Sequence, residues 1–183
     1  MQRTVAVAAV AYDAYRWHVW WSAALLFPVG SALHFVFRWA GCARWVATFG
    51  AVNESTYEHL KIGMWPLLLW HLMHTLAYGA PLGRAVVAPL AAGACMVTVN
   101  GLCRVLQWEP FFFDLFLFWL SLVAGQATAL RCWEFPAPLA AFTALVVLLS
   151  ILTFAPPSWP YLFGDPTRHG AVGIPPDACG GAR

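Results

Sequence analysis

The sequence predicts an all-α fold, a polytopic transmembrane helix bundle of about five spans. Of its 183 residues, 61% are hydrophobic and only 10% are charged, whereas soluble domains carry about 25% charged residues. Apolar stretches recur that are long enough to cross a hydrocarbon core of ~30 Å. The charges stand in short clusters and sum to +2, so they form no basic patch for a phosphate backbone and we expect no nucleic-acid partner. The expected partner is the lipid bilayer, and the expected localisation is integral to a membrane with several passes.

The first span is expected at about residues 19–39. It opens with Trp20 and Trp21 and closes with Arg38 and Trp39. Aromatic and cationic residues of this kind mark the interface between membrane and water. The flanks therefore indicate where the first helix enters and leaves the bilayer.

The second span is expected at residues 56–78, and its start carries a capping box. In this motif the Ser55 side chain accepts from the backbone amide of Glu58, while the Glu58 side chain reaches back to Ser55. The motif fixes where the helix begins.

Three further spans are expected at about residues 85–106, 111–130 and 139–155. The connections 79–84, 107–110 and 133–138 are short and contain Gly or Pro. Because short connections join antiparallel neighbours, successive helices should run in opposite directions.

The chain is expected to divide into three parts. Residues 1–18 form an amino-terminal segment, 19–156 the five-helix transmembrane domain, and 157–183 an extramembrane tail. Pro156 and Pro157 stop the fifth span, and the tail after them is rich in Gly and Pro without helical periodicity. Such a composition predicts an extended or partly disordered segment.

Two features bear on the compartment. The five cysteines form no C-x-x-C pair, so they predict neither a disulfide framework nor a zinc knuckle. Lys and Arg number four on the amino-terminal side of the bundle and six on the opposite side, which leans toward an outside amino terminus. The first group is Arg3, Arg16, Arg84 and Arg131, and the second is Arg38, Arg44, Lys61, Arg104, Arg168 and Arg183.

The densest polar cluster is the block from Asn53 to Lys61, directly before an apolar run. Glu54 and Glu58 are four residues apart and would share a face if the helix extended back through Glu54. Close carboxylates share a proton, pair with a cation or bind a metal. The alternative is structural: Asn53 or Ser55 caps the helix and Lys61 is solvated at the interface.

His34 lies deep in the first span. A histidine facing lipid is costly, so its side chain should point into the bundle, where ionisable groups are candidates for function. If the first two helices pack side by side, His34 can meet Glu54, Glu58 and His59. This mixture of nitrogen and carboxylate ligands suits Zn, Fe or Mn, so a transition metal is a cofactor it allows. The expected metal ligands are His34, Glu58 and His59, with Lys61 as a counter-charge.

Two polar residues on later spans extend the candidate site. Asn100 lies on the third span, in a stripe with Cys103 and Gln107. Asp114 lies in the first turn of the fourth span, where the helix dipole stabilises an anion. Asp114 is therefore either a carboxylate that favours the helix start or a charged lining of a cavity.

Several motifs together resemble a family of small polytopic membrane proteins known only as a domain of unknown function. The family signature is roughly V-N-E-S-x-W-E-H-L-K after a G-S-x-x-H-F turn, and Tyr57 stands here where the family has Trp. The carboxyl-terminal residues look like its closing P-P-x-x-P-L-F-x-D-P motif. The resemblance implies about five spans and a polar site near the first motif, but no reaction. It rests on Gly30-Ser31, Leu33-His34-Phe35, Val52-Asn53-Glu54-Ser55, Glu58-His59-Leu60-Lys61, Trp65-Pro66, Pro156-Pro157, Leu162-Phe163 and Asp165-Pro166.

Three functions stay open. In the first, an interfacial polar site handles a proton, a metal ion or a small polar ligand. In the second, the same residues form a metal site that activates water against a lipid-like substrate. In the third, the protein is a non-catalytic assembly subunit or scaffold of a membrane complex, or a homo-oligomer, whose polar residues only lock helices together.

Overall fold

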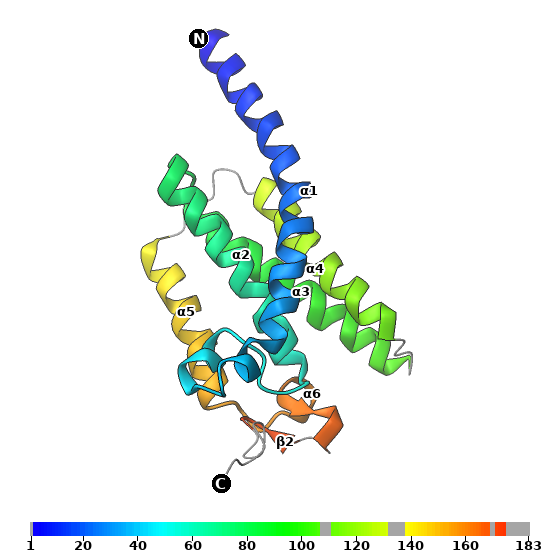
Figure 1. Ribbon diagram of the computed structural model, residues 1–183. Coiled ribbons are helices and arrows are strands. Elements are labelled where there is room, and N and C mark those ends of the chain that lie inside the picture. Colours follow the sequence, from blue (N-terminus) through cyan, green and yellow to red (C-terminus); the bar gives the residue numbers. More distant parts are fainter. Residues whose placement is uncertain (1, 107–110, 132–137, 169–170, 175–183) are drawn as a thin grey trace.

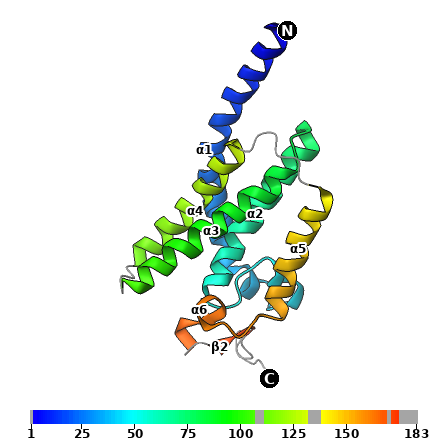
Figure 2. The same ribbon diagram turned by 180° about the vertical axis from the view of Figure 1, so that it is seen from behind.

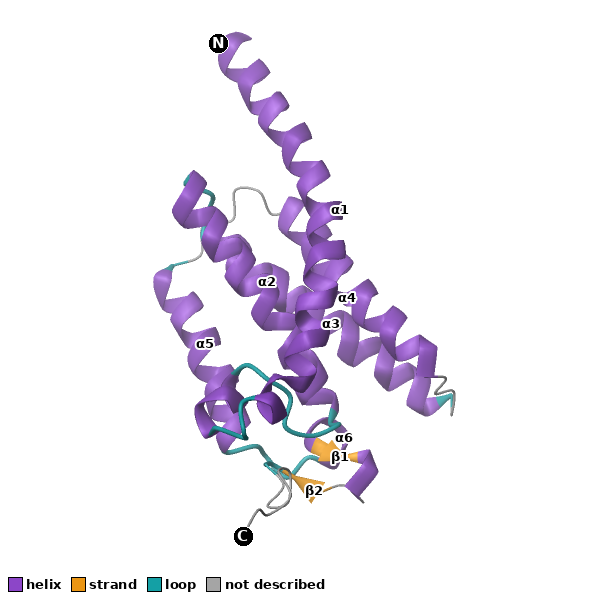
Figure 3. Cartoon of the chain, in the orientation of Figure 1, coloured by secondary structure: helices purple, strands orange, loops and turns teal. Residues whose placement is uncertain are grey.

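The computed structural model describes residues 2–106, 111–131, 138–168 and 171–174, and this part of the chain is almost entirely helical, which confirms the all-α prediction (Figure 3). The five long helices are α1 Gln2–Trp39, α2 Thr56–Tyr78, α3 Gly83–Val105, α4 Phe111–Arg131 and α5 Leu139–Phe154. The short elements are η1 Arg44–Thr48, α6 Pro160–Phe163, β1 Gly164–Asp165, η2 Pro166–Arg168 and β2 Ala171–Val172. β1 and β2 pair antiparallel, with Asp165 opposite Ala171.

α2 is central in the arrangement. α3 packs against α2 and α4, and α1 packs against the same two helices. The amino-terminal part of α1 projects beyond the other helices, whereas α6 and the strands lie at the opposite end (Figure 1). The reverse view shows α5 on the side of the bundle away from the start of α1, and α5 contacts α3 and η1 (Figure 2).

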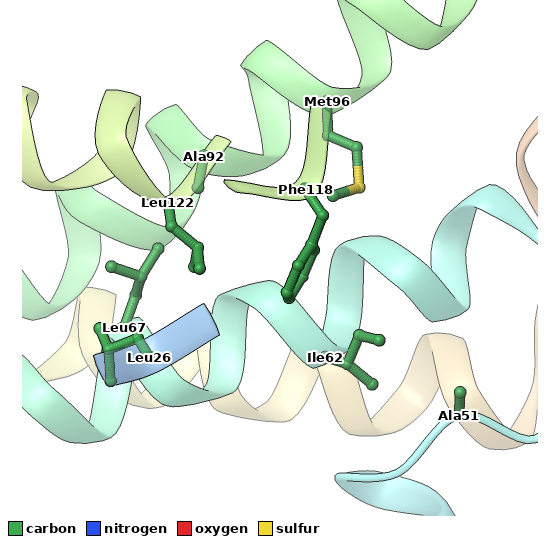
Figure 4. Close-up of a cluster of buried hydrophobic side chains, with 8 residues drawn as sticks. All are labelled: Leu26, Ala51, Ile62, Leu67, Ala92, Met96, Phe118 and Leu122. Atoms are coloured by element: carbon green, nitrogen blue, oxygen red, sulfur yellow. The ribbon is translucent and has the colours of Figure 1, made fainter. Parts of the chain in front are cut away.

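Two apolar clusters hold these helices together. One lies among α1, α2, α3, α4 and the loop before α2, and Figure 4 shows its side chains converging: Leu26, Ala51, Ile62, Leu67, Ala92, Met96, Phe118 and Leu122. The other packs α5 and α6 against α2: Tyr57, Met64, Trp65, Leu68, Leu145, Leu149 and Phe163. The second cluster fixes the first turns of α2 against the carboxyl-terminal segment.

The helix boundaries follow local chemistry. Ser55 caps α2 as predicted, since its hydroxyl accepts from the backbone N–H of Glu58 at 3.3 Å. α2 ends where Gly79 adopts a left-handed conformation with φ 67°, which costs glycine little. α2 has the predicted bounds and α3, α4 and α5 agree within two residues, but α1 begins at Gln2, well before the expected first span. The expected connection 107–110 lies outside the described residues, as does 133–137.

Two of the five expected spans meet the requirements of length and composition. Within the described residues, Gly83–Cys103 and Phe112–Arg131 are long and apolar enough to cross a membrane. α5 is apolar, but its 16 residues cover only ~24 Å at ~1.5 Å per residue. α2 contains Glu58, Lys61 and His71, which lower its average hydropathy. A bundle of five spans is therefore not confirmed.

Two local findings differ from the expectations. Residues 160–168 and 171–172 of the tail contain α6, η2 and the strand pair, although the tail lacks helical periodicity. Such short elements are stabilised by contacts with distant residues, which leave no periodic pattern. In addition, Cys42 is disulfide-bonded, whereas no disulfide was expected; Cys95 and Cys103 are free.

Candidate metal centre

The centre forms where the loop before α2 meets α1. Asn53 shapes this loop, because its side-chain oxygen accepts from the backbone N–H of Ser55 at 2.9 Å. The helix begins directly afterwards, at Thr56. Glu54 therefore belongs to the loop and not to the helix, so it does not share a helical face with Glu58.

Three side chains from three segments meet at this point. His34 Nε2 lies 3.3 Å from Glu54 Oε1, and His59 Nε2 lies 3.7 Å from Glu54 Oε2. The two imidazole rings are 5.3 Å apart between centroids. One ligand atom from each residue can be chosen so that all three lie within 4.8 Å of one another. His34 is thus brought from α1 to the start of α2, as the sequence predicted.

The orientation of His59 is fixed by a backbone contact. Its Nδ1 lies 3.0 Å from the carbonyl oxygen of Ser55. An Nδ1–H that donates to this oxygen leaves the Nε2 lone pair directed toward Glu54. Metal-binding histidines in proteins are commonly held in this way, with the second ring nitrogen on a carbonyl or carboxylate.

Glu54 is set up as an anion. The hydrogen bond from His34 is the main cause that lowers the pKa of the Glu54 carboxyl below 4.5, and the charges of His34, His59 and Arg38 add to it. Burial acts in the opposite direction. The three side chains are 23%, 37% and 39% exposed for His34, Glu54 and His59, so an ion can reach them from solvent.

Glu58 and Lys61 form a separate, buried pair. Lys61 Nζ lies 2.6 Å from Glu58 Oε2, with the side chains 0% and 4% exposed. Lys61 also donates to the Ala47 carbonyl at 2.7 Å, and Glu58 accepts from the Val52 backbone N–H at 2.9 Å. This last contact replaces the expected return bond of the capping box to Ser55. The pair ties η1 and the following loop to α2.

Glu54 takes the place in the histidine cluster that the sequence analysis assigned to Glu58. The cluster of ligand atoms contains His34, Glu54 and His59, whereas the Glu58 carboxylate is occupied by Lys61 and Val52. The physical reason is the position of the helix start. Lys61 has the predicted role of a counter-charge, but for Glu58 and inside the protein.

The carboxyl-terminal segment holds this loop in place. Asp165 is 2% exposed and its Oδ2 accepts from the Glu54 backbone N–H at 3.4 Å. Asn53 donates through Nδ2 to the Gly173 carbonyl at 3.0 Å. The sequence analysis did not assign Asp165 a role. Its local signal was the D-P-T stretch, because Asp165 accepts from the backbone N–H and the hydroxyl of Thr167 at 2.8 and 2.6 Å.

Asn100 and Asp114 are placed on the walls of a pocket beside the cluster. The pocket has a volume of about 240 Å³, and Glu54 and His59 form part of its lining. Asn100 comes from α3 and Asp114 from α4. His34 and Asn53 lie outside it and line a smaller neighbouring hollow with Arg38. The eight predicted site residues are therefore divided among a cluster, a buried pair, a loop contact and a pocket.

A family model matches most of the chain. The model described as "Family of unknown function (DUF6512)" matches residues 9–174. This range contains the cluster, the pocket and the folded part of the tail. No curated protein and no solved structure matches the chain.

Proposed function

We propose that this chain, which belongs to the family of unknown function DUF6512, is a multi-pass membrane protein that holds one transition-metal ion at His34, Glu54 and His59. The observation that supports it is the convergence of two imidazoles and a carboxylate, with ligand atoms within 4.8 Å. They come from α1, the loop and α2, so the site depends on the tertiary fold.

The distances between these ligand atoms fit a metal site. In a tetrahedral zinc site with bonds of ~2.0–2.1 Å, neighbouring ligand atoms lie about 3.3 Å apart. The two histidine–carboxylate separations are 3.3 and 3.7 Å, so a small inward movement would complete the geometry. Two nitrogens and one oxygen leave a fourth position open, as in catalytic zinc sites.

A role as a scaffold is less well supported by the burial of these groups. Side chains that only lock helices together should be buried and fully satisfied, as Glu58 and Lys61 are. The His34, Glu54 and His59 side chains are partly exposed. The chain therefore keeps one charged pair for packing and a second, accessible group for binding.

The membrane part of the proposal rests on the apolar helices. Gly83–Cys103 and Phe112–Arg131 can each cross a bilayer. We propose that α1, α2 and α5 join them as further spans. In α2 the buried side includes Glu58, Lys61 and His71, whereas the exposed residues Leu69, Met73 and Leu76 are apolar. This sidedness suits a helix with its polar groups inside the bundle.

Metal analysis of the purified protein tests the proposal. The protein is extracted in detergent, stripped with a chelator, reloaded with Zn²⁺ and analysed by mass spectrometry for metal. We expect about one equivalent of zinc per chain in the wild type. Glu54→Gln and His59→Ala should each lower the affinity for zinc at least tenfold.

His74→Ala is the matched control, because His74 is a histidine of the same helix outside the cluster and its loss should leave zinc binding unchanged. The proposal fails if the folded wild type binds no stoichiometric metal, or if the Glu54 and His59 variants retain it. If these variants gave less folded protein and the wild type bound no zinc, the scaffold role would be supported instead.

A further inference from the structure

We propose that the pocket beside the metal centre binds the carbonyl end of a neutral single-chain amphiphile, a fatty-acyl ester or amide, and that the centre hydrolyses it. This inference rests on the proposed metal site. Glu54 and His59 belong both to the cluster and to the wall of the pocket. A ligand bound in the pocket would therefore lie next to an ion held by the cluster.

The pocket has a polar and an apolar part. Glu54, His59, Asn100 and Asp114 supply hydrogen-bonding groups at its wall. The apolar part of the lining includes Met96, Phe113, Leu117 and Phe118. Such a lining fits a ligand with a polar group at one end and a hydrocarbon chain at the other.

The position of the pocket along the helices fits a ligand that comes from the bilayer. Asn100 lies close to the end of the apolar stretch Gly83–Cys103, and Asp114 close to the start of Phe112–Arg131. This is the depth at which acyl chains meet the polar interface. The same helix ends expose the apolar side chains of Leu102, Leu106, Phe112, Leu115 and Phe116.

The charges select a neutral head group. Glu54 and Asp114 are the acidic groups among the described residues that line the pocket, and no Lys or Arg lines it there. An acidic lining without Lys or Arg among its described residues disfavours a phosphate or free carboxylate head group, whereas an uncharged ester or amide carbonyl could approach a bound metal ion.

The volume limits how much of the ligand enters. Pockets for drug-sized ligands span about 300–1,000 Å³, and this one has about 240 Å³. It can take the carbonyl group and the first carbons of one chain. The rest of the chain would lie against the exposed apolar residues of α3 and α4. A two-chain lipid does not fit this arrangement.

The reaction consumes one water. A metal ion held by His34, Glu54 and His59 would supply an activated water. The Asp114 carboxylate on the same pocket wall would take the proton of this water, and the hydroxide would add to the carbonyl carbon. The bond from this carbon to the alcohol oxygen or amine nitrogen then breaks. The proton held by Asp114 passes to the leaving group, so the products are a fatty acid and an alcohol or amine.

The test uses the zinc-loaded full-length protein in detergent, with a monoacylglycerol and an N-acylethanolamine as neutral probes and a lysophosphatidic acid as the anionic probe. Released fatty acid is quantified by mass spectrometry. We expect release from at least one neutral probe, its loss after chelation, and no release from the anionic probe. Asp114→Asn should lower kcat by about 10²-fold or more while the zinc content stays at the wild-type level.

A second pair of variants tests the pocket while leaving Asp114, the proposed base, unchanged. Asn100→Trp should fill the pocket and raise KM for the neutral probe, whereas Leu90→Trp, an exposed position on the same helix, should leave hydrolysis unchanged. If zinc binds but neither neutral probe is hydrolysed, or Asp114→Asn is as active as the wild type, the hydrolase inference is overturned and the metal site stands. If zinc does not bind, the proposed function itself fails.

Discussion

Glu58 and Lys61 illustrate how a charged pair stabilises the fold without serving the site. Both side chains are buried, so Glu58→Gln leaves an uncompensated ammonium in the protein interior. We expect it to lower the free energy of unfolding by about 3–5 kcal/mol, the usual cost of breaking a buried pair. Removing both charges in Glu58→Gln/Lys61→Met should recover most of this loss. Thermal unfolding in detergent measures both.

The matched control is Glu54→Gln, which removes a carboxylate that is partly exposed and should cost less than about 1 kcal/mol. If Glu58→Gln were as stable as the wild type and bound no zinc, Glu58 would belong to the metal site and would not be part of a separate structural pair.

Glu54 predicts a pH dependence of stability in the metal-free protein. Its pKa is lowered below 4.5, mainly by the hydrogen bond from His34. A carboxyl with a lowered folded pKa contributes stability that is present above its unfolded pKa and is lost as pH falls through the folded value. The lead in Tm of the wild type over Glu54→Gln should therefore persist at neutral pH and vanish below 4.5. A lead that grows on acidification would contradict this assignment.

For the metal centre, the sequence predicted which side chains lie close together but not which of them pair. His34, Glu54 and His59 were all expected at one site. The pairing depends on the direction of the Glu54 side chain, which is set by the Asn53 contact with Ser55 and by Asp165, 111 positions further along the chain. A spacing of four residues carries no information about either contact.

Close packing of α3 against α4 depends on a single glycine. A Cβ added at Gly125 would lie 2.6 Å from the Ala88 carbonyl oxygen, which belongs to the backbone and cannot turn away. Gly125→Ala should therefore force the helices apart and destabilise the protein by about 1–3 kcal/mol. Gly93→Ala is the matched control, because its Cβ would meet side-chain atoms at ordinary contact distances, the Met64 sulfur at 3.4 Å and Leu60 Cδ1 at 3.5 Å. Equal Tm values for the two variants would contradict the close approach.

The carboxyl-terminal segment should act on the metal centre through Asp165. Asp165→Ala removes the acceptor for the Glu54 backbone N–H, so the loop that carries Glu54 loses a support. We expect zinc affinity to fall about tenfold, as for other residues that orient a ligand. Arg168→Ala is the control, since its contact with Asp165 is 4.0 Å long and partly exposed. Unchanged zinc affinity in Asp165→Ala would show that the segment does not position Glu54.

Elements were predictable where local signals fix them. α2 has the expected bounds because Ser55 caps its start and Gly79 ends it. The segment after Pro157 was expected to be extended or partly disordered, because it is rich in Gly and Pro and lacks helical periodicity. Its strands contain two residues each, which is too short for an alternating pattern. These strands exist because the segment packs on α2 through Phe163 and binds the loop through Asp165.

For the whole molecule, average hydropathy does not reveal that α2 has polar groups on its buried side and apolar groups on its exposed side. Glu58, Lys61 and His71 are buried, whereas Leu69, Met73 and Leu76 are exposed. An average along the sequence combines both sides and loses this distinction. Composition and periodicity therefore predicted the helical fold, but the number of spans requires knowledge of which groups face the protein interior.

The orientation across the membrane can be argued from charge and from Cys42. The count of six cations against four favoured an outside amino terminus, but Lys61 is neutralised by Glu58 in the interior and Arg183 is far from any span. Without these two, each end has four cations, and charge no longer decides. Cys42 is disulfide-bonded and lies just beyond α1, at the end of the bundle that carries the metal centre. Disulfides persist in oxidising compartments, so this end should face away from the cytosol.

Reporter fusions test this orientation. Alkaline phosphatase, which is active only after export, should be active when fused to the carboxyl terminus and inactive at the amino terminus, with a fluorescent protein giving the opposite result. The long projecting helix α1 would then begin in the cytosol (Figure 1), and the site would meet metal ions and amphiphiles from the exported side. The reverse pattern would mean that the centre works in a reducing compartment, where the Cys42 disulfide would not persist.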